Sequence, residues 1–77
     1  MFQNNHLGEN ADPREATQMA IKLLGGYAET ARKFQISRAA VHQWSRLRVP
    51  ANRVRMMARL VDHQVTPEQI RPDVFAD

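Results

Sequence analysis

Apolar residues along this chain recur three or four positions apart, in short segments separated by glycine, proline and polar residues. This spacing predicts about five short helices and no strands. The first helix is expected over 12–24, where Asp12-Pro13-Arg14-Glu15 combines a capping carboxylate, a first-turn proline and a glutamate that can return the bond. Gly25-Gly26 ends it, because glycine accepts the left-handed cap conformation. Its expected apolar face comprises Ala16, Met19, Ala20, Leu23 and Leu24.

Residues 27–44, YAETARKFQISRAAVHQW, are the most informative segment. They predict two short helices, over 27–34 and 37–45, joined by a tight turn, with Ser37 capping the second. Ala31 falls where the helices would cross, and Ile36 and Val41 follow at the spacing that fills the gap between them. This is the pattern of a helix-turn-helix, which places its second helix in the DNA major groove. The residues expected to be buried are Ala28, Ala31 and Phe34 in the first helix and Ala40, Val41 and Trp44 in the second.

Two further helices are expected after this segment. Pro50 opens one of them, and Thr66-Pro67-Glu68-Gln69 is a capping box that begins a last short helix, which Pro72 stops. Residues 1–11 show no apolar periodicity and are expected to form a flexible N-terminal arm. The predicted fold is therefore a compact all-α bundle of about five short helices over 12–77. The helix that Pro50 opens should bury Val54, Met57, Ala58 and Val61.

Size and composition argue against several classes of function. The chain has 77 residues and no cysteine, so neither disulfides nor thiolate metal sites can form. Its longest apolar run is only a few residues, against the roughly 20 that a membrane-spanning helix requires, so no membrane partner is expected. No signal segment opens the chain, which predicts a cytoplasmic location. His6, His42 and His63 share no metal-ligand spacing, and we expect neither a cofactor nor an enzymatic activity.

The charge is concentrated in the middle of the chain. The net charge is +3, but residues 27–59 carry eight lysines and arginines against Glu29 alone, which is a local charge of +7. Seven of these eight cations are arginine, whose planar guanidinium suits phosphate geometry. A polyanion is the natural partner of such a segment. The alternative is that the charges form an ordinary solvated helix surface.

The outward residues of the second helix of the motif are the candidate base readers. They are Arg38, Ala39, His42 and Gln43. Arg38 could contact guanine O6 and N7, Gln43 matches adenine, and Ala39 can touch a thymine methyl. The alternatives are that Arg38 is a solvated first-turn residue and that His42 is an ordinary exposed histidine. Trp44 is expected in the core, rather than as a stacking platform for single-stranded bases.

Phosphate contacts are expected on both sides of this helix. Free amide groups at the start of the helix over 27–34 favour an anion, and Tyr27 can offer its hydroxyl there. Ser37 could divide its time between capping and a phosphate. Such contacts fix register and salt dependence without carrying sequence information. The candidate phosphate-binding residues are Tyr27, Ser37, Arg46, Arg48 and Arg53.

The run AIKLLGGYAETARKFQISRAAVHQW, followed by RVP, a helix and VTPEQIRPDVF, resembles the Cro-type repressors of temperate phages. It is most similar to the branch that includes the YdaS-type antitoxin-like regulators of prophage regions, and the resemblance covers about residues 19–75. It implies a lambda repressor-like fold, operator binding and the base-reading and backbone-contact residues given above. One departure is Gln35, which occupies a turn position where the family usually has glycine. A left-handed conformation there costs about 1 kcal/mol relative to glycine.

Three functions remain open at this stage. The first is a sequence-specific, operator-binding repressor, and the varied polar residues at 38–43 favour it. The second is an antitoxin-like module whose main partner is a toxin protein, with DNA binding as autoregulation; the short segment after Phe75 argues mildly against a toxin-binding tail. The third is a non-specific nucleic-acid-binding or protein-interacting domain.

A homodimer on DNA is also expected, because two-fold operators normally match two-fold proteins. Its interface would use the fourth helix and the C-terminal segment, unless their apolar residues cover the core of a single chain instead. The residues concerned are Met56, Val65, Ile70, Val74 and Phe75.

Overall fold

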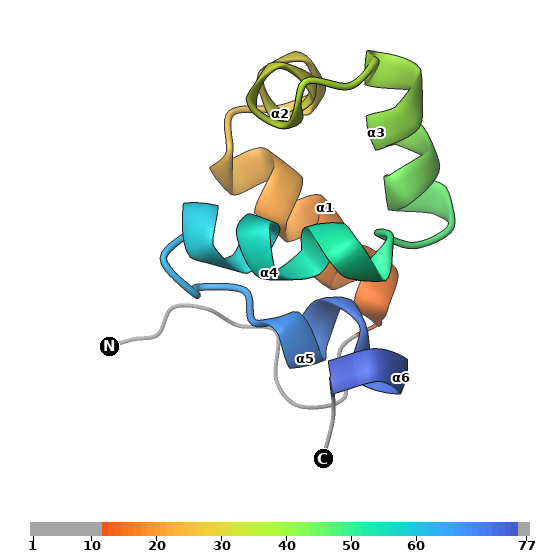
Figure 1. Cartoon of the computed structure of the whole chain (residues 1–77), viewed down its shortest axis with the longest axis vertical. Coiled ribbons are helices and arrows are strands. Elements are labelled where there is room, and N and C mark those ends of the chain that lie inside the picture. The colour runs from red at the N-terminus through yellow and green to blue at the C-terminus, as the bar shows by residue number, and fades with distance from the viewer. Residues whose placement is uncertain (1–11, 76–77) are drawn as a thin grey trace.

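The computed structural model describes residues 12–75, which form six helices and no strand (Figure 1). The predicted all-helical fold is confirmed. The expected arm over 1–11 lies outside the described residues. The helices are α1 (Pro13–Leu23), α2 (Tyr27–Phe34), α3 (Arg38–Arg46), α4 (Ala51–Leu60), α5 (Pro67–Ile70) and α6 (Pro72–Phe75).

Pro72 begins a helix as well as ending one, which the sequence prediction missed. Arg71 has φ −138° and ψ 74°, outside the α-helical region that a following proline disfavours. Proline then suits the first position of a new helix, because its missing N–H would have no partner there. α6 therefore follows α5 directly and turns the chain back toward the loop between α3 and α4.

The buried face of α1 is rotated from the one predicted. Leu23 is 43% exposed, Met19 is half-buried, and Thr17 and Ile21 lie in the core instead. Thr17 tolerates burial because its hydroxyl donates to the Pro13 carbonyl at 3.0 Å. The resulting stripe follows the 3.6-residue period as well as the predicted one does. It comprises Ala16, Thr17, Ala20, Ile21 and Leu24.

The packing of α2 against α3 follows the expected crossing. Ala31 is 5% exposed, and the rings of Phe34 and Trp44 meet edge to face with centroids 5.1 Å apart. Two expectations for this pair of helices were wrong. Ala28 is exposed and Thr30 is buried in its place, while Ala40 is half-buried.

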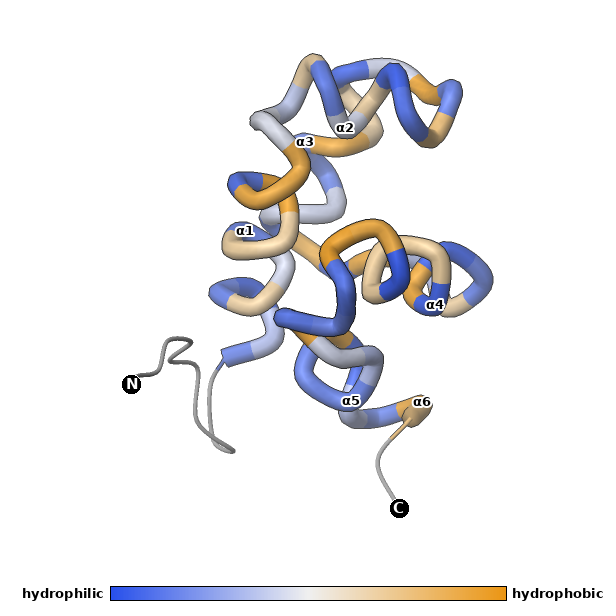
Figure 2. The backbone as a smooth tube through the Cα atoms, turned by 90° about the vertical axis from the view of Figure 1, so that its left-hand side faces the viewer, coloured by the Kyte–Doolittle hydropathy of each residue, from blue (hydrophilic) through white to orange (hydrophobic). Residues whose placement is uncertain are grey.

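The C-terminal half closes the core from the other side. Val54, Met57, Ala58 and Val61 are all buried, as predicted. Val65 and Ile70 are also fully buried within the single chain, so they are not available for a dimer interface. Figure 2 shows hydrophobic segments in both α1 and α4, with α5 beneath these two helices. No helix within residues 12–75 has the length and apolar character needed to cross a membrane.

Thr30 supplies a test of this core. Its Oγ1 is buried and has no hydrogen-bond partner among the described residues. Thr30→Val should therefore raise the free energy of unfolding by about 1 kcal/mol, because it removes an unsatisfied hydroxyl and keeps the side-chain shape. Thr17→Val is the matched control: it loses the bond to Pro13 and should lower the same free energy by about 1 kcal/mol. Urea unfolding followed by circular dichroism measures both, and a destabilising Thr30→Val would contradict the assignment.

Candidate nucleic-acid interface

The turn between α2 and α3 holds the second helix at a fixed angle. Gln35 adopts the left-handed conformation, with φ 58° and ψ 46°, so the departure from glycine leaves the turn type unchanged. The Ile36 amide donates to the Ala31 carbonyl at 3.0 Å, and Ile36 packs against the core. Ser37 then caps α3, because its Oγ accepts from the Ala40 amide at 3.0 Å.

The rotation of α3 about its own axis is set by its buried side. Val41, Trp44 and Ser45 are buried, and the Ser45 hydroxyl donates to the His42 carbonyl at 2.8 Å. The opposite side is exposed along its whole length. It presents the four predicted base readers, Arg38, Ala39, His42 and Gln43.

One contact on this face was not predicted. The rings of Tyr27 and His42 stack with centroids 4.0 Å apart and planes within 3° of parallel. This stack ties the N-terminus of α2 to the exposed side of α3 and restricts the rotamers of both residues. His42 remains exposed in this stack, whereas Tyr27 is half-buried.

The N-terminus of α2 lies beside this stack. Gly26 precedes the helix with φ 105°, a backbone conformation that side-chain-bearing residues rarely adopt. No side chain caps α2, so its first amide groups remain oriented outward at the positive end of the helix dipole. Such an end favours an anion, and Tyr27 flanks it as expected.

The far end of α3 opens into a groove of about 630 Å³. The predicted residues Gln43, Arg46 and Arg48 line it together. Arg14 from α1 and Leu47, which is 67% exposed, also line it and were missed by the sequence prediction. Arg14 was missed because it is 32 positions from Arg46 and only the packing of α1 against α3 brings them together.

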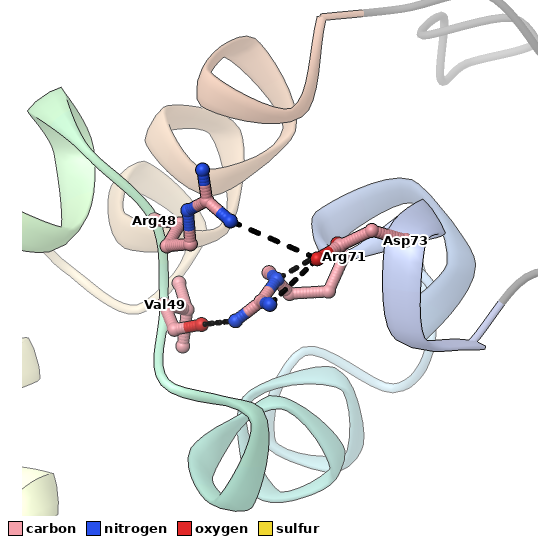
Figure 3. A network of polar contacts seen from close by, with 4 residues as sticks. All are labelled: Arg48, Val49, Arg71 and Asp73. Atoms are coloured by element: carbon pink, nitrogen blue, oxygen red, sulfur yellow. Dashed lines mark hydrogen bonds and ion pairs between the residues drawn. The ribbon is translucent and has the colours of Figure 1, made fainter.

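A polar network fixes the loop that carries Arg48 (Figure 3). Arg71 forms a bidentate pair with Asp73, at 2.9 Å and 2.7 Å, and donates its third bond to the Val49 carbonyl at 2.9 Å. Arg48 completes the network with an ion pair to Asp73 at 3.7 Å. The Arg71 side chain is only 13% exposed, so it is a structural arginine. The ion pair with Asp73 partly neutralises the charge of Arg48 before any ligand binds.

The network predicts an acid-sensitive contact. The hydrogen bonds from Arg71, with the charges of Arg71 and Arg48, lower the pKa of Asp73 to about 2. Because this pKa lies below its ordinary value of 3.8, the contact stabilises the fold above about pH 4 and is lost as pH falls toward 2. An NMR titration of the Asp73 carboxyl carbon should give a midpoint near 2, and Arg71→Gln should return it toward 3.8. A wild-type midpoint near 3.8 would contradict the network.

Arg53 is less available than expected. It is half-buried, and its guanidinium lies over the Phe34 ring at 6.0 Å from the centroid. This cation–π contact keeps it on the same side of α4 as α2. Among the predicted phosphate-binding residues, Arg46 is the exposed arginine that forms no ion pair with a carboxylate of residues 12–75.

The predicted base-reading and phosphate-binding residues lie on α2, on α3 with its cap, in the loop that follows α3, and on α4. The residues described here contain no cluster of histidine, aspartate or glutamate that could hold a metal ion. The fold and this surface define a small all-helical domain of the helix-turn-helix type. The chain belongs to the family described as bacterial toxin YdaS, whose family model matches residues 17–77. No curated protein and no solved structure matches it.

Proposed function

We propose that this protein is a sequence-specific regulator of transcription, a Cro-like repressor of phage or prophage origin that binds double-stranded operator DNA. The exposed face of α3 carries the proposal, because it combines an arginine, a methyl group, a histidine and an amide on a firmly seated helix. A non-specific binder would need only cations there. The protein would act where the DNA is, in the cytoplasm, and without a cofactor or a catalytic step.

The proposed contacts follow the geometry of the surface. Arg38, Ala39, His42 and Gln43 would read bases in the major groove, with His42 oriented by Tyr27. The N-terminus of α2 would meet one phosphate, and Arg46 and Arg48 would meet phosphates at the other end of α3. Ser37 acts chiefly as a cap, and Arg53 adds positive potential from beside Phe34. Arg14 joins the phosphate-binding group.

A homodimer on DNA is part of the proposal. A single domain of this size makes too few contacts for tight specific binding, and a two-fold operator would supply two half-sites. Of the residues expected at the interface, Val74 is 46% exposed, and Met56 and Phe75 are half-buried. These three remain the candidates, since Val65 and Ile70 belong to the core.

The salt dependence of binding tests the phosphate contacts. Arg46→Ala should weaken binding to every duplex about equally and reduce the slope of log K against log salt by about one. Arg48→Ala should reduce the slope by less, because Arg48 must give up its ion pair with Asp73 when it binds a phosphate. Fluorescence anisotropy of labelled 20-base-pair duplexes (about two helical turns) at several salt concentrations measures both slopes. A larger reduction of the slope in Arg48→Ala than in Arg46→Ala would contradict these roles.

A second candidate function rests on the family description, which names a toxin. In this alternative the chain is one member of a toxin–antitoxin pair, its main partner is a protein, and DNA binding serves autoregulation. The resemblance in the sequence suggested the antitoxin role, whereas the description favours the toxin role. Induced synthesis in a bacterial host distinguishes them: growth arrest that persists in an Arg38→Ala, Gln43→Ala double variant would favour a toxin acting apart from DNA.

A further inference from the structure

The basic segment divides between two sides of the molecule. Arg53 and Arg55 are two positions apart on α4, which places them about 200° apart around the helix. Arg53 lies against Phe34 of α2, whereas the Arg55 guanidinium lies over the Phe75 ring of α6, 5.3 Å from its centroid. Figures 1 and 2 both show α5 and α6 across α4 from α2. Arg55 therefore belongs to a surface away from the base-reading helix.

This second surface contains a cavity of about 430 Å³ between α4 and the C-terminal helices. Arg55, Arg59 and His63 line one wall, and Pro67, Glu68 and Phe75 line the other. Arg55 and Arg59 are one helical turn apart and both exposed. Neither forms an ion pair with a carboxylate within the described range 12–75. The cavity thus offers two adjacent cations beside two apolar side chains, those of Pro67 and Phe75.

The backbone at the end of α4 brings the third basic residue into this wall. Asp62 and His63 both adopt left-handed conformations, with φ 55° and 57°. Each such conformation costs about 1 kcal/mol for a residue other than glycine. The Asp62 amide still donates to the Arg59 carbonyl at 3.0 Å, so the turn is well defined. The strained turn holds His63 beside Arg59 in place of a straight continuation of the helix.

We propose that this cavity binds an acidic helical segment of a partner protein. Two carboxylates one turn apart would pair with Arg55 and Arg59, and an apolar side chain between them would pack against Pro67, beside the contact of Arg55 with Phe75. The volume suits a few side chains. The apolar part lowers the local dielectric constant, which strengthens the Coulomb attraction within such pairs relative to fully exposed ones.

Nucleic acid fits this surface less well. A duplex presents an unbroken row of charge, whereas the cavity that holds Arg55 and Arg59 also contains Glu68, which would repel a neighbouring phosphate. The apolar side chains of Pro67 and Phe75 also contribute nothing to binding a phosphate backbone. A short acidic segment places its charges only where the two arginines are. The proposal does not depend on DNA binding by α3, since it uses different residues on a different side of α4.

The test uses the full chain and a fluorescein-labelled, alanine-based peptide of roughly 16 residues, long enough to form a helix. The peptide carries glutamates at i and i+4 with leucine between them, and a control peptide of the same composition carries them two residues apart. The variant is the double substitution Arg55→Gln, Arg59→Gln, at two exposed positions, and the control is Arg38→Gln, at an exposed position of α3 outside the cavity. Circular dichroism checks that each variant is folded. A mixed-sequence duplex is titrated in parallel.

The expected result is saturable binding of the i, i+4 peptide that weakens about tenfold or more in the double variant, with little change in Arg38→Gln. The control peptide should bind more weakly to the wild-type chain. Binding of the mixed-sequence duplex should change little in Arg38→Gln, and in the double variant it should change less than peptide binding does. Absence of saturable peptide binding, equal loss in both variants, or a larger effect of the double variant on duplex than on peptide would overturn the proposal. Absence of duplex binding by the wild-type chain and by both variants would refute only the DNA-binding function.

Discussion

Arg38→Ala should weaken binding to a cognate operator by about 1–3 kcal/mol and relax the preference at one base pair. Arg38 is the first residue of α3 and is exposed, beside the Ser37 cap that holds the helix start in place. A guanidinium at that end can make two parallel hydrogen bonds to guanine, which alanine cannot replace. Because the side chain supports no core contact, the variant should unfold at the same temperature as the wild type.

Competition between cognate and scrambled duplexes measures this effect. The difference in free energy between the two duplexes should shrink in Arg38→Ala, while binding to the scrambled duplex changes little. Arg55→Ala removes the same charge from the other side of α4 and is the matched control. It should leave the discrimination between duplexes unchanged. If Arg38→Ala weakens binding to both duplexes equally, Arg38 contacts a phosphate, which would contradict its role as a base reader.

Trp44→Ala should lower the free energy of unfolding by about 3–5 kcal/mol, the usual cost of removing a large core aromatic. Trp44 is 6% exposed and meets Phe34 edge to face between α2 and α3. The free energy of unfolding of a small domain is only about 5–15 kcal/mol, so little of the variant should remain folded on warming. Trp44→Phe keeps an aromatic ring against Phe34 and should lose less.

Thermal and urea unfolding followed by circular dichroism distinguish the two possible roles of Trp44. If Trp44 belongs to the core, the alanine variant should lose stability and DNA binding together, and DNA binding should return under conditions that stabilise the fold. A loss below about 1 kcal/mol, within the range of ordinary surface substitutions, would instead place the ring on the surface. The fixed orientation of α3 would then need another explanation, since Val41 and Trp44 are the large residues that seat it.

Features encoded within four or five residues were predictable from the sequence. The Ser37 cap, the Thr66–Gln69 capping box and the glycine pair at the end of α1 all have their partners close by in the chain. Their hydrogen bonds depend on local backbone geometry, which the residue types determine. The exposed face of α3 followed in turn from where that helix begins and from the burial of Trp44.

Features that depend on how helices cross were not predictable. The rotation of α1 that buries Ile21 and exposes Leu23 depends on its neighbours, because either leucine or isoleucine fits a 3.6-residue stripe. The bond from Arg71 to the Val49 carbonyl spans 22 positions. The Tyr27–His42 stack joins two helices, and the partition of arginines between two sides of α4 needs the positions of both α2 and α6.

Selection of bound duplexes from a random DNA pool, at near-physiological salt, tests the central claim most directly. The account predicts an inverted repeat whose half-sites lie about one helical turn apart, as a dimer with α3 in successive major grooves requires. Recovery of no consensus, with binding that disappears as salt rises, would contradict sequence-specific recognition and leave only electrostatic attraction between the basic segment and DNA.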